Sequence, residues 1–135
     1  MKLSIITINF NNSAGIQKTL GCLTDIGCTN DVEHIIVDGG SNDGSLDFIK
    51  KHATISSNVK YVTEADNGIY DAMNKGLLMA SGEYVAFLNS GDVFNVGINV
   101  ETYLNLISAH QNVDGIYSNL IFLNHAGQVV RSWRA

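Results

Sequence analysis

The chain lacks several features that mark common protein classes. Its 135 residues include no proline and only two cysteines, Cys22 and Cys28. Because no histidine or further cysteine stands at metal-ligand spacing from them, both thiols are expected to be reduced, with a disulfide or metal role as the alternative. No apolar run approaches the roughly 20 residues that cross a bilayer, so no membrane-spanning helix is predicted. Residues 1–8 turn polar too early for a signal peptide and are expected to form a strand instead.

Positive charge is also scarce. Eight lysines and arginines face 13 aspartates and glutamates, the net charge is −5, and no basic cluster occurs. A nucleic-acid partner is therefore not expected, and an anionic ligand would need a metal ion or local backbone donors. The apolar content of 45 % argues against disorder, and the length fits one domain with its own core.

Several catalytic motifs are missing as well. The sequence has neither a Gly-x-Ser-x-Gly nucleophile elbow nor a Gly-Lys-Ser/Thr phosphate loop. Residues 9–13 contain no Gly-x-Gly-x-x-Gly, which counts against a nicotinamide dinucleotide fold. The four histidines, at positions 34, 52, 110 and 125, are scattered and are expected to be structural or surface residues.

Apolar strand-like runs alternate with helical periodicity along most of the chain. Strand–helix alternation of this kind predicts an α/β fold, with a Rossmann-like, mainly parallel sheet and helices on both faces. The last segment, around the turn at residues 124–127, predicts a C-terminal β-hairpin instead. Strands are predicted at residues 3–8, 32–37, 59–63, 84–88, 115–118, 120–123 and 128–131, and helices at residues 14–24, 45–52, 69–80 and 98–110.

Two acidic loops containing glycine follow two of the predicted strands. Residues 38–45 read DGGSNDGS, and residues 89–92 read NSGD. Because ligands of open α/β sheets bind at the carboxyl ends of the strands, both loops are predicted to reach one nucleotide–metal site. Asp38 can accept a hydrogen bond from a base or a ribose, Asn89 can supply a neutral oxygen, and Asp92 can ligate Mg²⁺ or Mn²⁺. The alternative for each loop is a plain polar turn, with Asp43 or Ser45 capping the next helix.

The predicted helix at residues 69–80 has small residues at every fourth position, Gly68, Ala72 and Gly76. This spacing predicts close packing of the helix on the sheet. Two interpretations remain open, packing alone or packing that aims polar side chains at a ligand, and the side chains concerned are Asp71, Asn74 and Lys75. Lys75 can neutralise a phosphate or can be an ordinary surface lysine.

Four segments together resemble the nucleotide-sugar-binding part of a family 2 glycosyltransferase with the A-type glycosyltransferase fold. Within that family they are most similar to bacterial enzymes that build exopolysaccharide, such as colanic acid, or O-antigen. The resemblance covers nearly the whole chain and makes residues 1–135 one nucleotide-sugar-binding domain. The segments are residues 4–11, 36–45, 66–76 and 82–92.

The resemblance implies a role for each site residue. Thr7 and Asn9 would line the nucleotide pocket, and Asp38 would contact the base. Gly40 and Ser41 would lie near the ribose. Asp92 would be the principal ligand of Mn²⁺ or Mg²⁺. The residues expected to face the diphosphate or the donor sugar are Asp66, Asp71 and Asn74. Lys75 and Asn89 are further candidates for substrate binding because of their side-chain chemistry.

The resemblance also implies an activity and its partners. The expected reaction is inverting transfer from a nucleoside diphosphate sugar, with UDP-sugars favoured, to a glycan or lipid-linked acceptor in surface polysaccharide synthesis. The expected location is the cytoplasm, peripherally at the inner face of the cytoplasmic membrane.

The chain departs from the family pattern at three points. Asn89 and Gly91 replace carboxylates of the acidic motif, and Met73 replaces a common arginine. The acceptor site and the general base are expected in a further segment, so the chain is expected to be truncated, and neither Asp71 nor Glu64 is assigned as the base. The alternatives are a non-catalytic, nucleotide-binding or self-associating fragment, with Tyr117, Phe122 and Trp133 as contacts, and a nucleotidyltransferase, which should carry a basic glycine-rich loop.

Overall fold

The computed structural model describes residues 3–25, 30–55, 57–95, 99–110 and 113–135. The chain forms two compact units, Met1–Asn105 and Leu106–Ala135. Within the described parts of the chain, no helix is long and apolar enough to cross a membrane. Cys22 is a free cysteine, and Cys28 lies outside the described residues.

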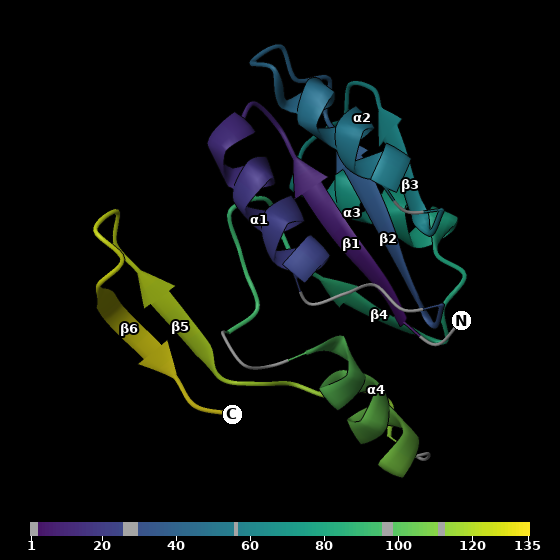
Figure 1. The fold of residues 1–135 in the computed structure, drawn as a ribbon, viewed down its shortest axis with the longest axis vertical. Coiled ribbons are helices and arrows are strands. Elements are labelled where there is room, and N and C mark those ends of the chain that lie inside the picture. Colours follow the sequence, from purple (N-terminus) through teal and green to yellow (C-terminus); the bar gives the residue numbers. More distant parts are fainter. Residues whose placement is uncertain (1–2, 26–29, 56, 96–98, 111–112) are drawn as a thin grey trace. The chain divides into compact units, whose positions relative to one another are not determined.

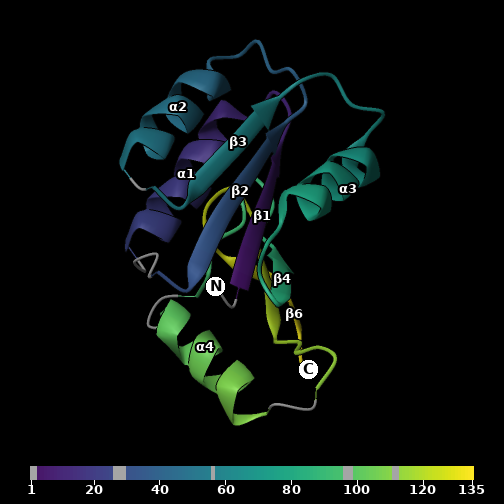
Figure 2. The ribbon, with the colours of Figure 1, turned by 90° about the vertical axis from the view of Figure 1, so that its right-hand side faces the viewer.

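The first unit is an α/β layer structure built on a four-stranded parallel sheet. Its strands lie side by side in the order β3, β2, β1, β4. Helices α1 and α2 cover one face of the sheet, and α3 covers the other (Figures 1 and 2). The predicted parallel sheet with helices on both faces is therefore confirmed. The elements are β1 (Leu3–Asn9), α1 (Ser13–Asp25), β2 (Val32–Asp38), α2 (Ser45–Ile55), β3 (Val59–Thr63), α3 (Ile69–Met79), β4 (Tyr84–Phe87) and α4 (Val100–Ala109), whose first residues belong to this unit.

The two central strands are buried on both faces. Every residue of β1 and of β2 is buried. Successive side chains of a strand point to opposite faces, so Ile5 packs in one cluster with Leu23 of α1, and Ile6 packs in another with Ala72 of α3. This two-sided burial explains why both strands are nearly continuous apolar runs in the sequence.

Helix α3 approaches the sheet closely through its small residues. A Cβ atom built on Gly76 would lie 2.5 Å from Cγ2 of Ile6, closer than side-chain atoms tolerate. Ala72 and Gly76 are the two buried residues of this helix. The predicted close packing is thus present at Ala72 and Gly76, whereas Gly68 is exposed before the first turn of α3 and does not pack on the sheet.

A buried carboxylate ties together the edge of the sheet where the strands begin. Glu33 accepts hydrogen bonds from Ser4 Oγ at 2.7 Å, from Ser81 and from Lys60 Nζ at 2.7 Å. Burial raises the pKa of Glu33, but the hydrogen bonds from Lys60, Ser4 and Ser81 outweigh it and lower the pKa to about 2. Glu33 is therefore ionised and links β1, β2 and the entry to β4.

The second unit contains a β-hairpin of β5 (Leu120–Leu123) and β6 (Val129–Trp133). The hairpin was predicted and is confirmed, but the strand predicted at residues 115–118 is wrong. These residues have no regular structure, and Ile116 and Tyr117 are 44 % and 82 % exposed. A strand needs a neighbour for its backbone hydrogen bonds, and neither described sheet pairs with this segment.

Candidate functional site

The polar loops predicted from the sequence meet at one edge of the sheet. Asn9 at the end of β1 is in register with Asp38 at the end of β2, and Asp38 with Thr63 at the end of β3. Beyond β4, the backbone N–H of Ser90 donates to the carbonyl of Ile8 at 3.1 Å. The loop after β4 therefore runs beside the end of β1, as parallel strands in this order require.

Asp38 is the centre of a buried hydrogen-bond network. Its Oδ1 accepts from Asn9 Nδ2 at 2.8 Å and from Ser41 Oγ at 2.6 Å. Its Oδ2 accepts from the backbone N–H of Ser41 at 2.9 Å and from Thr63 Oγ1 at 2.8 Å. Burial raises the pKa of Asp38, but these hydrogen bonds, led by that of Ser41, hold it below its usual value. The carboxylate is ionised and fully bonded by protein donors, so its contact with a base stays a prediction.

The loop at residues 38–45 is anchored on both sides. Ser41 Oγ accepts from the backbone N–H of Asn11 at 2.8 Å. Asp43 accepts from the backbone N–H groups of Ser45 at 3.1 Å and of Ser13 at 2.7 Å, so it caps α2, as predicted, and also holds the start of α1. Gly40, expected near the ribose, is exposed in this loop.

The loop at residues 89–92 is held by α1. Asn12 Nδ2 donates to the carbonyl of Ser90 at 3.1 Å, and Thr19 Oγ1 donates to the carbonyl of Asp92 at 2.8 Å. The backbone N–H of Gly91, a residue with φ of 103°, donates to Thr19 Oγ1 at 2.9 Å. Asn12 and Thr19 were not predicted as site residues, although a threonine on the apolar face of α1 was an available signal.

Two side chains of this loop, Asn89 and Asp92, carry oxygens of the kind that a hard cation prefers. The Asp92 side chain is exposed, and no hydrogen bond to its carboxylate is found among the described residues. Asn89 Oδ1 is buried and has no hydrogen-bond partner within the described parts of the chain. No group of three His, Cys, Asp or Glu side chains that could hold a metal occurs there either. The donor set therefore fits a metal that takes its remaining ligands from phosphate and water.

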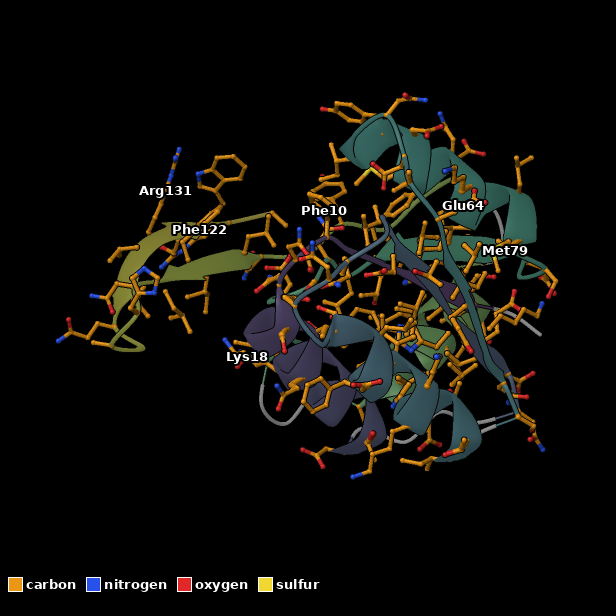
Figure 3. All side chains as sticks on the ribbon, turned by 90° about the horizontal axis from the view of Figure 1, so that it is seen from above. Phe10, Lys18, Glu64, Met79, Phe122 and Arg131 are labelled. Atoms are coloured by element: carbon orange, nitrogen blue, oxygen red, sulfur yellow. The ribbon has the colours of Figure 1, made fainter. Side chains whose placement is uncertain are left out.

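A cavity of about 350 Å³ opens beside this loop. It contains an exposed aromatic ring, Phe10, of which 63 % is accessible to solvent (labelled in Figure 3). Asp66 lines the cavity and also lies against the loop that begins at Asp38. A Cβ atom built on Gly39 of that loop would be only 2.6 Å from Asp66 Oδ2. The lining residues are Ile8, Phe10, Asn12, Asp66, Gly68, Ile69, Asn89 and Ser90.

The predicted residues of α3 do not line this cavity. Lys75 Nζ lies 3.0 Å from Glu64 Oε1, 3.5 Å from Asp71 Oδ2 and 2.9 Å from the carbonyl of Ala65. These contacts, led by the hydrogen bond to Glu64, raise the pKa of Lys75. Asp71 also accepts from the backbone N–H of Asn67 at 2.9 Å, which is the main cause of its lowered pKa. Lys75 thus fastens the segment before α3, while Asn74 is exposed.

Thr7 lies beneath the site rather than in its wall. Its side chain is fully buried, and Thr7 Oγ1 is 2.9 Å from His34 Nε2. His34 Nδ1 is in turn 3.3 Å from His52 Nε2 of α2. Burial, and secondarily repulsion from a charged His52, lower the pKa of His34 to about 3, and burial lowers the pKa of His52 as well, so both rings are neutral at pH 7. The predicted role of Thr7 in nucleotide binding stays a prediction.

The sheet and its strand-end loops have the architecture of A-type glycosyltransferases. The structure of Staphylococcus aureus TarS in complex with UDP-GlcNAc matches 87 % of this chain and 37 % of its own, with a TM-score of 0.70 and 26 % identity. The Pyrobaculum calidifontis mannosyltransferase PcManGT in complex with GDP-Man and Mn²⁺ matches 87 % of this chain and 34 % of its own, with a TM-score of 0.69. Its identity is 20 %, which shows the fold alone.

The sequence comparisons give the family. Residues 4–127 match the family model described as Glycosyl transferase family 2, so the chain belongs to this family. An uncharacterised glycosyltransferase of Mycobacterium tuberculosis is 37 % identical over 93 residues, which are 69 % of this chain and 35 % of that protein. The chain spans less than half the length of the curated relatives that it matches.

Proposed function

We propose that this chain is the donor-binding part of an inverting glycosyltransferase that uses a nucleoside diphosphate sugar and a divalent metal. The observation that carries the proposal is the unpaired, buried Oδ1 of Asn89, a residue that lines the cavity and shares its four-residue loop with the exposed Asp92. An unpaired buried oxygen costs about 1–3 kcal/mol, which a bound metal or donor group would recover. Such a cost is expected at a binding site where the bound metal or donor group supplies the missing partner of the oxygen.

The nucleotide is proposed to lie across the strand ends. Phe10 offers a ring on which a base can stack, and Asp66 offers a carboxylate oxygen to a base N–H or a ribose hydroxyl. Asp38 acts by fixing Ser41 and Asn9, which shape the loop expected near the ribose. A UDP-sugar is favoured because TarS, the 26 % identical protein, was solved with UDP-GlcNAc.

The metal is proposed to bind at the loop after β4. Asp92 would be its carboxylate ligand, and Asn89 Oδ1 would supply a neutral oxygen from the same loop. When bound, Mn²⁺ or Mg²⁺ supplies Lewis-acid stabilisation of the diphosphate leaving group. Lys75 forms ion pairs with Glu64 and Asp71. We therefore assign its positive charge to stabilising the segment before α3 and not to binding a phosphate.

The reaction is one displacement at the anomeric carbon. The acceptor hydroxyl forms the new C–O bond, the bond to the diphosphate breaks, and a general base takes the hydroxyl proton. We propose that this base and the acceptor site lie in a segment beyond these 135 residues. A glycan or lipid-linked acceptor in surface polysaccharide synthesis, at the inner face of the cytoplasmic membrane, is part of the same proposal.

Calorimetric titration of UDP tests the proposal. Binding in the presence of Mn²⁺ should weaken strongly in EDTA and in Asp92→Ala. Glu83→Ala is the matched control, because Glu83 is an exposed carboxylate just before β4 and Asp92 lies just after the opposite end. No binding of UDP, GDP or dTDP by the chain would contradict the proposal and favour a non-catalytic module.

A second candidate function is self-association through the hairpin. Both strands of the hairpin are exposed along their whole length, including Phe122 and Trp133 at 41 % and 50 %. Arg131 lies over the Trp133 ring at 4.6 Å and near Phe122 (Figure 3). Sedimentation equilibrium of the chain and of Trp133→Ser tests this function, since a monomer at all concentrations would exclude it.

A further inference from the structure

Thr19 is a fully buried polar residue on the apolar face of α1, beside Ile16, Leu20 and Leu23. It contacts the loop at residues 89–92, which lies 70 to 73 positions further along the chain. Thr19 has no role in the proposed function.

One hydroxyl group holds three backbone groups of this loop. Thr19 Oγ1 accepts from the N–H of Gly91 at 2.9 Å and donates to the carbonyl of Asp92 at 2.8 Å. The carbonyl of Asn89 is a longer second acceptor at 3.3 Å. The backbone is thus fixed at the amide of Gly91, one residue before Asp92, and at the carbonyl of Asp92 itself.

A second threonine of α1, Thr24, forms a different kind of hydrogen bond from Thr19. Thr24 Oγ1 donates to the carbonyl of Leu20 in its own helix at 2.9 Å, the usual arrangement for a helical threonine. Thr19 instead directs its hydroxyl away from α1 and into the loop.

We propose that Thr19 is the positioning residue of the metal site: it aims the Asp92 carboxylate and the Asn89 oxygen at the cation. This inference rests on the proposed function. Asp92 is exposed, and none of the described residues bonds to its side chain, so the position and tilt of its backbone set where its Cα–Cβ bond points and which region the carboxylate can reach. Partners of metal ligands commonly contribute tenfold to a hundredfold in metal affinity.

The test compares four versions of the chain: unsubstituted, Thr19→Val, Thr19→Ser and Thr24→Val. Valine matches threonine in shape but lacks the hydroxyl, serine keeps the hydroxyl, and Thr24→Val makes the same change in the same helix away from the loop. The readouts are the Mn²⁺ affinity at fixed UDP concentration and the UDP affinity in EDTA, both by calorimetry.

Thr19→Val should weaken Mn²⁺ binding about tenfold or more while UDP affinity in EDTA stays unchanged. Thr19→Ser and Thr24→Val should both bind Mn²⁺ like the unsubstituted chain. Unchanged Mn²⁺ affinity in Thr19→Val, or an equal loss of metal-free UDP binding, would overturn the inference while leaving the proposed function intact. Absence of metal-dependent binding in the unsubstituted chain would overturn the proposed function itself.

If Thr19→Val does not fold, a measurement on the unsubstituted chain tests whether Thr19 holds the loop at residues 89–92. The Gly91 amide proton, bonded to a buried hydroxyl, should exchange slowly with solvent in an NMR experiment. Exchange as fast as that of an open loop would show that Thr19 does not hold the loop, and the inference would fall.

Discussion

Three aspartates at the edge of the sheet differ in what their carboxylates contact. Asp38 is buried and accepts four hydrogen bonds from protein donors, whereas Asp92 is exposed and has no side-chain bond among the described residues. Asp66 lies between these extremes, with Oδ1 accepting from the backbone N–H of Gly68 at 2.9 Å and Oδ2 beside Gly39. A ligand would therefore find its open carboxylates at Asp66 and Asp92, while Asp38 maintains the shape of the site.

At the same scale, Phe10 provides a test of how the nucleotide is held. Phe10→Ala should weaken UDP binding by about 1–3 kcal/mol, since this is what stacking of a base on an aromatic ring contributes. The measurement is UDP titration with Mn²⁺ present. Tyr117→Ala, which removes an 82 % exposed ring from the second unit, should leave the affinity unchanged. Equal affinities of Phe10→Ala and the unsubstituted chain would show that the base lies elsewhere.

At the scale of elements, two helical glycines differ in their surroundings. A Cβ atom on Gly76 of α3 would collide with Ile6, whereas one on Gly21 of α1 would meet no atom within 4 Å. Gly76→Ala should therefore lower the free energy of unfolding by about 1–3 kcal/mol through overpacking. Gly21→Ala should raise it by up to about 1 kcal/mol, because alanine has the higher helix propensity.

Urea denaturation of both variants gives the comparison. Stabilisation by Gly76→Ala would mean that α3 does not pack on β1 as closely as described. Loss of stability in Gly21→Ala would point to a contact of α1 that the structure does not contain.

The regular elements of the first unit were predictable because each has a strong local signal. Buried parallel strands appear as apolar runs, and α1 and α3 repeat their apolar or small residues with helical spacing. The segment at residues 115–118 has a similar apolar run, but strand formation depends on a neighbouring strand, which a local pattern cannot reveal.

The candidate site was predictable only in part, for a related reason. Strand-end position indicated Asp38, Asn89 and Asp92, because parallel strands end at one edge. The roles of Asp38 and Lys75 as protein-bonded groups, and the bonds of Thr19 to a loop far along the chain, depend on tertiary contacts. Such contacts do not follow from residue type or spacing.

At the scale of the whole molecule, buried ionisable groups should make stability depend on pH. His34 has a folded-state pKa of about 3, lowered from 6.5 by burial and by His52. The unfolded chain therefore gains a proton below pH 6.5 that the folded chain does not, and the stability present above pH 6.5 is lost as the pH falls. Glu33, with a folded-state pKa of about 2 instead of 4.5, adds a second loss that begins only near pH 4.5.

Between pH 6.5 and pH 5 the histidine effect should therefore dominate. The free energy of unfolding, measured in urea at pH 7.5, 6.5 and 5.5, should fall by about 1 kcal/mol from pH 6.5 to 5.5 through His34, and His52, whose pKa is also lowered by burial, adds to this fall. His34→Gln keeps a polar side chain facing Thr7 and His52 but does not titrate, so it should reduce this slope to the part that His52 contributes. His125→Gln, which changes an exposed histidine in the hairpin turn, should keep the slope of the unsubstituted chain. A free energy of unfolding that stays constant from pH 7.5 to 5.5 would show that His34 can be protonated in the folded chain, and that the buried contact from Thr7 to His52 is not maintained.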